Sequence, residues 1–165
     1  MLFRSAARER CLREERRLDK SFLLRVQYVR GMTCFLRARC ALATFDEDPR
    51  ARSAEAQAWY RKLSAEGSAW TNALAAIVLA GEALARGAIE AGAEYLARAA
   101  SLSEQADMAA HAQVCRATLG EIMGGTDGQQ LRHGAELALQ ELGVEHPRRF
   151  AAALLPYGRR SRTNN

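Results

Sequence analysis

The chain has 165 residues, of which 33 are alanine, whereas aromatic residues make up 7% and prolines number three. Alanine is the best helix former, and the residues that strands favour are scarce, so this composition excludes an all-β protein. The net charge of +5 is unevenly spread: basic and acidic residues number 15 and 8 in residues 1–62, 4 and 11 in 63–146, and 5 and 0 in 147–165.

The first 45 residues are expected to form two helical segments. Residues 1–20 mix arginine and glutamate with sparse apolar residues, which predicts a charged helical segment. From Ser21 to about Phe45, apolar side chains recur at helical spacing and predict a more amphipathic helix. Its apolar stripe contains Leu24, Tyr28, Cys34 or Phe35, and Leu42, with the arginines at 25, 30, 37 and 39 mostly off the stripe.

Capping signals divide the rest of the chain into helices. Asp48-Pro49 combines an N-cap acceptor with proline at the first helical position, and that helix is expected to end at Gly67. Ser68 caps a following helix that stops at Gly87. Further helices are predicted over about residues 89–104, 108–123 with Asp107 as cap, 129–142, and 147–155.

Short connections between these helices require sequential neighbours to pack antiparallel. Helix starts near residues 70, 89 and 107 are spaced at half the period of a 34-residue tetratricopeptide repeat. Residues 79–99 fit that pattern, with small residues where paired helices touch and glycine at the turn: Ala80, Ala83, Gly87, Gly92, Leu96 and Ala99.

The predicted fold is therefore all-α, with antiparallel helix hairpins stacked as a short tetratricopeptide-like α-solenoid over residues 21–156. A compact helical bundle is the alternative. Residues 157–165 are expected to be a basic disordered tail.

The four cysteines, Cys11, Cys34, Cys40 and Cys115, form no CxxC or CxxH pair. Such cysteines are typical of small buried side chains in a reducing compartment. The N-terminus is charged where a signal peptide would be apolar, and the longest uncharged run, residues 67–81, is too short to span a bilayer. We expect a cytoplasmic protein that does not enter the membrane.

Few residues have a spacing that suits catalysis or metal binding. His111 and Cys115 share a helix face, but a metal site needs three or four ligands, so a core cysteine beside a partly exposed histidine is favoured. His133 and His146 are isolated, and His146 is expected in a turn before Pro147. The sequence thus predicts no catalytic, cofactor-binding or metal-binding residue.

Three other groups have two interpretations each. The glycine-rich residues 124–128 invite a phosphate-loop interpretation, but no lysine lies near and no strand precedes them, which favours a helix end followed by a helix start. The aromatic residues either stack on a ligand or pack in the core, which their helical spacing favours: Trp59, Tyr60 and Trp70. The C-terminal arginines either bind phosphates or are solvated, and both remain open: Arg148, Arg149, Arg159, Arg160 and Arg162.

The C-terminal half carries a resemblance. Residues 106–125 read ADMAAHAQVCRATLGEIMGG, and Gly128 and the run GVEHPRR at residues 143–149 follow. This ending resembles the C-terminal region of large bacterial eukaryotic-like serine/threonine protein kinases of the myxobacterial type, and the similarity extends over about residues 15–158. Tyr157-Gly158 departs from it, because that family tends to have glycine directly after the proline. The resemblance implies tetratricopeptide-like helices that follow a kinase domain and an ATPase-like module.

The catalytic motifs of that family are missing from this sequence. No histidine begins an HRD loop and no aspartate begins a DFG motif. We therefore expect a non-catalytic module that binds a protein or peptide segment, with self-association through an uncovered helix face as a further expectation. The alternative is a weak electrostatic binder of nucleic acid or another anionic partner, although no DNA-reading motif supports sequence-specific binding.

Overall fold

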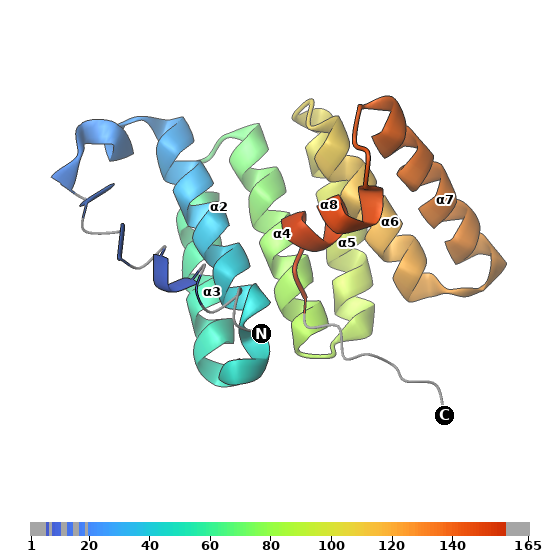
Figure 1. Cartoon of the computed structure of the whole chain (residues 1–165), viewed down its shortest axis with the longest axis horizontal. Coiled ribbons are helices and arrows are strands. Elements are labelled where there is room, and N and C mark those ends of the chain that lie inside the picture. Colours follow the sequence, from blue (N-terminus) through green and yellow to red (C-terminus); the bar gives the residue numbers. More distant parts are fainter. Residues whose placement is uncertain (1–5, 7, 11–12, 15–16, 19, 158–165) are drawn as a thin grey trace.

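The computed structural model describes residues 6, 8–10, 13–14, 17–18 and 20–157, and these residues form an all-α structure (Figure 1). Its helices, with η for 3₁₀-helices, are η1 (Phe22–Arg25), α2 (Gln27–Ala43), η2 (Phe45–Glu47), α3 (Pro49–Ala65), α4 (Ala69–Ala85), α5 (Ile89–Gln105), α6 (Ala109–Met123), α7 (Gly125–Glu141) and α8 (Pro147–Leu154).

The helices pack as sequential antiparallel hairpins, as predicted. The pairs α2–α3, α4–α5 and α6–α7 form three hairpins, and each hairpin packs on the next through α3 and α4 or through α5 and α6. The first helices of the hairpins, α2, α4 and α6, follow one another along the array (Figure 1), and α2 packs against α4. We call the surface that they form the α2–α4–α6 face.

Small residues lie where α4 and α5 touch, as the repeat-like pattern predicts. Ala80, Ala83 and Ala99 are completely buried. A Cβ atom on Gly92 would lie 2.3 Å from Cδ2 of Leu84, so only glycine fits between these helices without a shift of that side chain. The alanine and glycine content therefore sets the close spacing of this hairpin.

Two predicted helix starts are confirmed by their caps. The Asp48 carboxylate accepts a hydrogen bond of 3.1 Å from the backbone N–H of Ala51 at the start of α3. At the start of α4, the backbone N–H of Ser68 donates to Oγ1 of Thr71 at 3.2 Å. These caps satisfy N–H groups that have no partner inside the helix.

The predicted N-cap role of Asp107 is wrong. Met108 is the N-cap of α6, and Asp107 has a φ of 56° in the left-handed region. Its N–H donates to the carbonyl of Glu104, and the N–H of Met108 donates to that of Ser103. Asp107 thus closes the end of α5 where glycine is usual, because aspartate tolerates this backbone better than most residues.

The predicted start of the seventh helix is also wrong. α7 begins at Gly125 rather than near residue 129, so most of the glycine-rich stretch is helical. A Cβ atom on Gly120 of α6 would lie 2.5 Å from the carbonyl oxygen of Gly128, and a Cβ atom on Gly128 would lie 2.5 Å from that of Gly120. These two glycines therefore let the backbones of α6 and α7 cross closely.

Two side chains of α2 lie on the opposite side from that predicted. Arg37, expected off the apolar stripe, is buried with its guanidinium 4.8 Å from the ring centre of Trp59. Tyr28, expected on the stripe, is exposed, with its ring centre 5.5 Å from that of Trp70. The cation–π contact compensates for part of the cost of burying Arg37.

Helix α8 does not continue the hairpin array but crosses the α2–α4–α6 face (Figure 1). It packs against α6. The segment that ends it brings Leu155 next to Gly81 of α4, and Arg39 of α2 donates a hydrogen bond to the carbonyl of Ala153. Leu154 and Leu155 are buried there.

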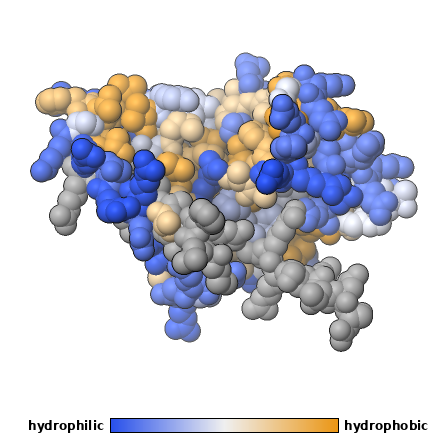
Figure 2. Space-filling model, viewed as in Figure 1, coloured by the Kyte–Doolittle hydropathy of each residue, from blue (hydrophilic) through white to orange (hydrophobic). Residues whose placement is uncertain are grey.

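The N-terminal end of the array exposes large apolar side chains. Figure 2 shows apolar residues gathered at that end of the molecule. The exposed apolar residues of η1, α2 and the residue between them form what we call the η1–α2 patch: Phe22, Leu23, Val26, Tyr28, Met32 and Leu36.

The described positions among the first 20 residues have helical backbone. Arg8 pairs with Glu55 of α3 at 3.0 Å. The rest of the predicted charged segment, and all but Tyr157 of the predicted tail, lie outside the described residues. Among the described residues, no helix combines the length and the apolar composition that crossing a bilayer requires.

Candidate functional site

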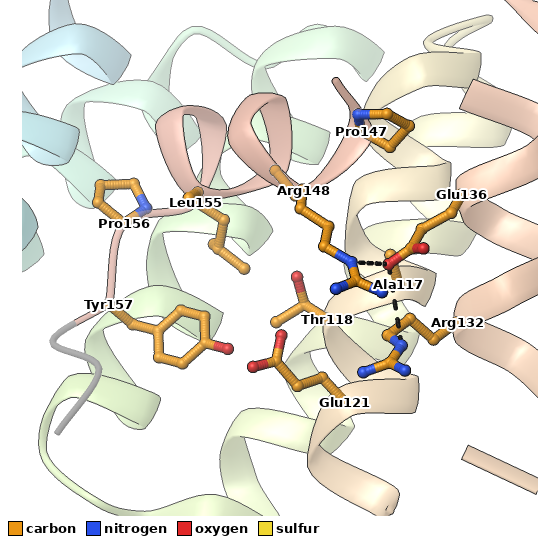
Figure 3. A pocket seen from close by; sticks show the side chains of 12 residues that line it. Ala117, Thr118, Glu121, Arg132, Glu136, Pro147, Arg148, Leu155, Pro156 and Tyr157 are labelled. Carbon is orange, nitrogen blue, oxygen red and sulfur yellow. Dashed lines mark hydrogen bonds and ion pairs between the residues drawn. The ribbon is translucent and has the colours of Figure 1, made fainter. Parts of the chain in front are cut away.

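A recess of about 290 Å³ lies where α8 meets α6 and α7 (Figure 3). Its polar lining comes from all three helices and from the segment after α8: Thr118, Glu121, Arg132, Glu136, Arg148 and Tyr157. The Glu136 carboxylate is shared, since its Oε1 lies 3.0 Å from Nε of Arg148 and 3.8 Å from Nε of Arg132. Glu121 and Tyr157 point toward one another on the other side of the recess (Figure 3).

Thr118 and the two arginines of the recess lining already have partners within the chain. The Thr118 hydroxyl donates back to the carbonyl of Val114 at 2.9 Å, inside its own helix. Arg132 and Arg148 share Glu136, so part of their charge is already neutralised. The recess therefore offers hydrogen bonds to a polar ligand, with the Glu121 carboxylate and the Tyr157 hydroxyl facing one another across part of it.

The predicted pair on α6 is explained by core packing. Cys115 is completely buried, and burial raises the pKa of its thiol to about 12. The His111 ring centre lies 6.4 Å from that of Phe35 on α2. Burial and the nearby Arg39 guanidinium lower the pKa of His111. In the part of the chain that the structure describes, no three potential metal ligands come together.

Arg39 has an unusual environment on the α2–α4–α6 face. Its guanidinium lies 5.4 Å from the ring centre of Phe35, and its Nη2 donates to the carbonyl of Ala153 on α8. Its Nε is buried without a hydrogen-bond partner, and burial lowers the pKa of this guanidinium below the usual arginine value. A guanidinium in this position is best stabilised by a carboxylate, which α8 does not supply.

The predicted aromatic residues pack against the core. Trp59, Tyr60 and Trp70 are all partly buried on the main apolar cluster. The Nζ atom of Lys62 lies 4.1 Å from the ring centre of Trp59, in addition to Arg37. Trp70 lies against Gly31, where a Cβ atom would be 2.3 Å from its ring. These rings are therefore occupied by neighbours of their own chain.

The isolated histidines and the described C-terminal arginines are at the surface. His133 is exposed on α7, and His146, predicted in a turn, is the exposed N-cap residue of α8 and follows the turn at residues 142–143. Arg148 pairs with Glu136, and Arg149 is exposed. Arg159, Arg160 and Arg162 lie outside the described residues.

Two features of the site have little local signal in the sequence. Arg39 is one of several arginines on its helix, and nothing in its neighbours indicates that it contacts a segment more than 100 residues away. The docking of α8 depends on Leu154 and Leu155, whose pattern shows an amphipathic helix but not the surface that it covers.

Comparisons with protein-family models, with curated proteins and with solved structures give no match for this chain.

Proposed function

We propose that the chain is a non-catalytic, tetratricopeptide-like interaction module whose α2–α4–α6 face binds a short helical segment of a protein partner. The observation that supports this function is the position of α8. An amphipathic helix of eight residues already lies on that face. Docking of a helix into an apolar surface is a recurrent mode of peptide recognition.

The contacts of α8 define what the face accepts. Leu154 and Leu155 are buried against it, whereas Arg149 points to solvent. Leu155 packs next to Gly81 of α4, where a Cβ atom would lie 3.4 Å from Cδ1 of Leu155, an ordinary van der Waals contact. A matching ligand is therefore a short helix with two consecutive apolar residues at its end.

The environment of Arg39 favours replacement of α8 by a partner helix. α8 satisfies this guanidinium with one backbone carbonyl and leaves Nε without a partner. A partner helix with a carboxylate near the position of Ala153 would supply a charge-assisted hydrogen bond that α8 lacks. Such a helix competes with α8 because it stabilises the buried charge better.

The proposal agrees with the resemblance to the C-terminal region of serine/threonine kinases. The sequence carries none of that family's catalytic motifs. We infer that the chain contributes recognition rather than phosphoryl transfer to a signalling protein.

The test uses the full chain with α8 undocked by Leu155→Asp, and a labelled synthetic peptide of residues 146–157. We expect the peptide to bind this variant, as measured by fluorescence anisotropy, and not the wild type, in which α8 covers the face. Ala152→Asp, at an exposed position of the same helix, is the matched control and should behave as the wild type. If the peptide does not bind the Leu155→Asp variant while helicity by circular dichroism is retained, the proposal is wrong.

For nucleic acid as the anionic partner, most of the described arginines give no support. Several of them already pair with carboxylates: Arg8, Arg30, Arg52, Arg86, Arg116 and Arg148. Paired arginines give up most of the charge that phosphate binding requires.

A further inference from the structure

The η1–α2 patch consists of other residues than those that contact α8, and it borders them, since Leu36 lies one helical turn before Arg39. Its side chains are among the most exposed large apolar residues described, with Phe22 at 75% and Tyr28 at 63% exposure. Tyr28, Met32 and Leu36 are four residues apart, so they form a stripe along α2. A contiguous exposed apolar surface of this kind marks an interaction site more often than an isolated residue does.

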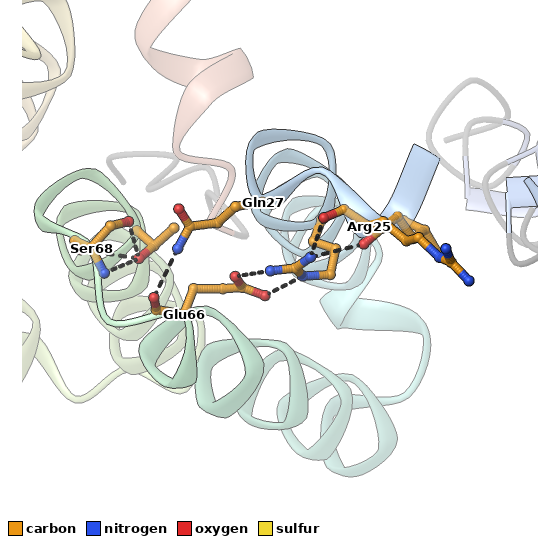
Figure 4. Close-up of polar contacts among 7 residues, drawn as sticks. Arg25, Gln27, Glu66 and Ser68 are labelled. Carbon is orange, nitrogen blue, oxygen red and sulfur yellow. Dashed lines mark hydrogen bonds and ion pairs between the residues drawn. The ribbon is translucent and has the colours of Figure 1, made fainter. Parts of the chain in front are cut away.

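The patch is held in a fixed conformation by Arg30 (Figure 4). The Arg30 guanidinium makes two hydrogen bonds of 2.7 Å to the Glu66 carboxylate after α3. Its Nη1 also donates to the carbonyls of Leu24 and Arg25, at 3.0 Å each. η1 is thereby fastened to the start of α2 and the end of α3, so the apolar side chains are positioned before any partner arrives.

A comparison of how α2, α4 and α6 are packed indicates what kind of partner would cover the η1–α2 patch. α4 packs between α3 and α5, and α6 packs between α5 and α7. α2 packs against α3 and α4, and of its stripe the Tyr28 ring lies beside Trp70 of α4 while it stays 63% exposed. At the opposite end of the array, the exposed side of α7 has one large apolar residue, Leu137, among the polar residues Gln130, His133 and Glu141. The uncovered side of α2 therefore fits another helix.

The charges next to the patch specify the character of that helix. Residues 20–43 contain five basic residues and no acidic one. Three of the five have neighbours within the chain, since Arg30 pairs with Glu66, Arg37 is buried and Arg39 contacts α8. Arg25 lies over the Phe22 ring at 4.6 Å from its centre, and in the described part of the chain neither Lys20 nor Arg25 pairs with a carboxylate. Two copies of the patch would bring like charges together, which disfavours a symmetric dimer through this surface.

We propose that the η1–α2 patch is a docking surface for an acidic amphipathic helix of a partner protein. Apolar residues of that helix cover Tyr28, Met32 and Leu36, and its carboxylates face Lys20 and Arg25. The two residue classes supply separate contributions, since apolar burial gives affinity and charge complementarity gives orientation and association rate.

The test measures binding of labelled peptides to the full chain by fluorescence anisotropy. The probe is a helical peptide of about 18 residues with leucine at positions three and four apart and glutamate as its only charged residue. A second peptide has lysine in place of every glutamate, and a third has the first composition in scrambled order. We expect the acidic amphipathic peptide to bind at least about tenfold more tightly than either control peptide.

Matched variants locate the binding surface. Leu36 on the patch and Leu137 on α7 are 47% and 46% exposed, so Leu36→Glu and Leu137→Glu introduce the same change at equal exposure. Leu36→Glu should weaken binding of the acidic peptide by about tenfold or more, and Leu137→Glu should leave it unchanged. Equal affinity for the glutamate and lysine peptides, or unchanged binding by Leu36→Glu, overturns the proposal.

Two further outcomes assign the surface to another partner and also overturn the proposal. In the first, the chain sediments with phosphatidylserine-containing vesicles and Leu36→Glu abolishes this binding, while the acidic amphipathic peptide does not bind the chain. The other is a dimer in analytical ultracentrifugation that Leu36→Glu converts to monomer.

Discussion

At the scale of single residues, three helical glycines differ in what surrounds them. A Cβ atom on Gly120 would lie 2.5 Å from the Gly128 carbonyl and 2.7 Å from the Arg132 backbone nitrogen. On Gly92 it would meet the Leu84 side chain, and on Gly134 it would meet nothing within 4 Å. Backbone atoms cannot rotate away as the end of a side chain can. Adding a side chain at these three glycines therefore changes the free energy of unfolding by different amounts.

We predict that Gly120→Ala lowers the free energy of unfolding by about 1–3 kcal/mol, because it overpacks two backbones. Gly134→Ala should raise it by about 0.5–1 kcal/mol through the better helix propensity of alanine. Gly92→Leu should cost about 1–3 kcal/mol, since leucine is too large for the space next to Leu84. Urea denaturation measures all three, and an unchanged midpoint for Gly120→Ala would contradict the close crossing of α6 and α7.

The pH dependence of stability provides a second residue-scale prediction. His111 is half-buried with its pKa lowered by burial and by Arg39, so the folded state disfavours its protonated form. Its contribution to stability is complete above the pKa of the unfolded chain, about 6.5. It is lost as pH falls, because the unfolded chain takes up the proton first.

We therefore expect the wild-type Tm to fall between pH 7.5 and 5.5 by more than the Tm of His111→Gln. His133→Gln, at an exposed position on α7, is the control and should show the same fall as the wild type. Equal pH dependence of the His111→Gln and wild-type proteins would exclude His111 as the titrating group.

At the scale of helices, local sequence signals predict where each helix begins and ends better than they predict which helices contact one another. Pro49 and Gly67 bracket α3, and Ser68 and Gly87 bracket α4, because caps and left-handed glycines act within one turn. The predicted start of α7 near residue 129 is wrong because a contact with another helix overrides the local glycine signal. Glycine usually ends a helix, but Gly128 is kept inside α7 by its contact with Gly120, which is eight residues away and on another helix.

The site could be predicted only in part, since it depends on contacts across the sequence. The packing of Cys115 and of the aromatic residues in the core follows from their helical spacing. The burial of Arg37 depends on Trp59, and the position of α8 depends on Arg39 and Gly81. No pattern within either segment encodes such a pairing, because amphipathicity shows which side is apolar and not what covers it.

At the scale of the whole molecule, α8 changes how the array unfolds. Each hairpin contacts its sequential neighbours, so an array without α8 would unfold in steps from its ends. α8 contacts α6, and the segment around its end contacts α4 and α2, so it connects all three hairpins. This connection makes unfolding more cooperative.

We predict that the wild-type chain unfolds in one transition in which circular dichroism and tryptophan fluorescence coincide. Both tryptophans lie in the first two hairpins, so fluorescence reports on that half of the array. In the Leu155→Asp variant the two signals should separate, because the last hairpin is no longer linked to the first. Coincident curves in that variant would show that contacts between neighbouring hairpins are sufficient for cooperativity.

The crossing of α8 also determines how the molecule responds to mechanical force. Its contacts lie one after another, from Arg39 and Gly81 at its C-terminal end to α6 at its start. Tension on the C-terminal end breaks these contacts singly, as in peeling, whereas each hairpin is held by many contacts along two helices. A small load therefore detaches α8 and uncovers the α2–α4–α6 face while the hairpins stay folded, so tension in a larger assembly would open this surface.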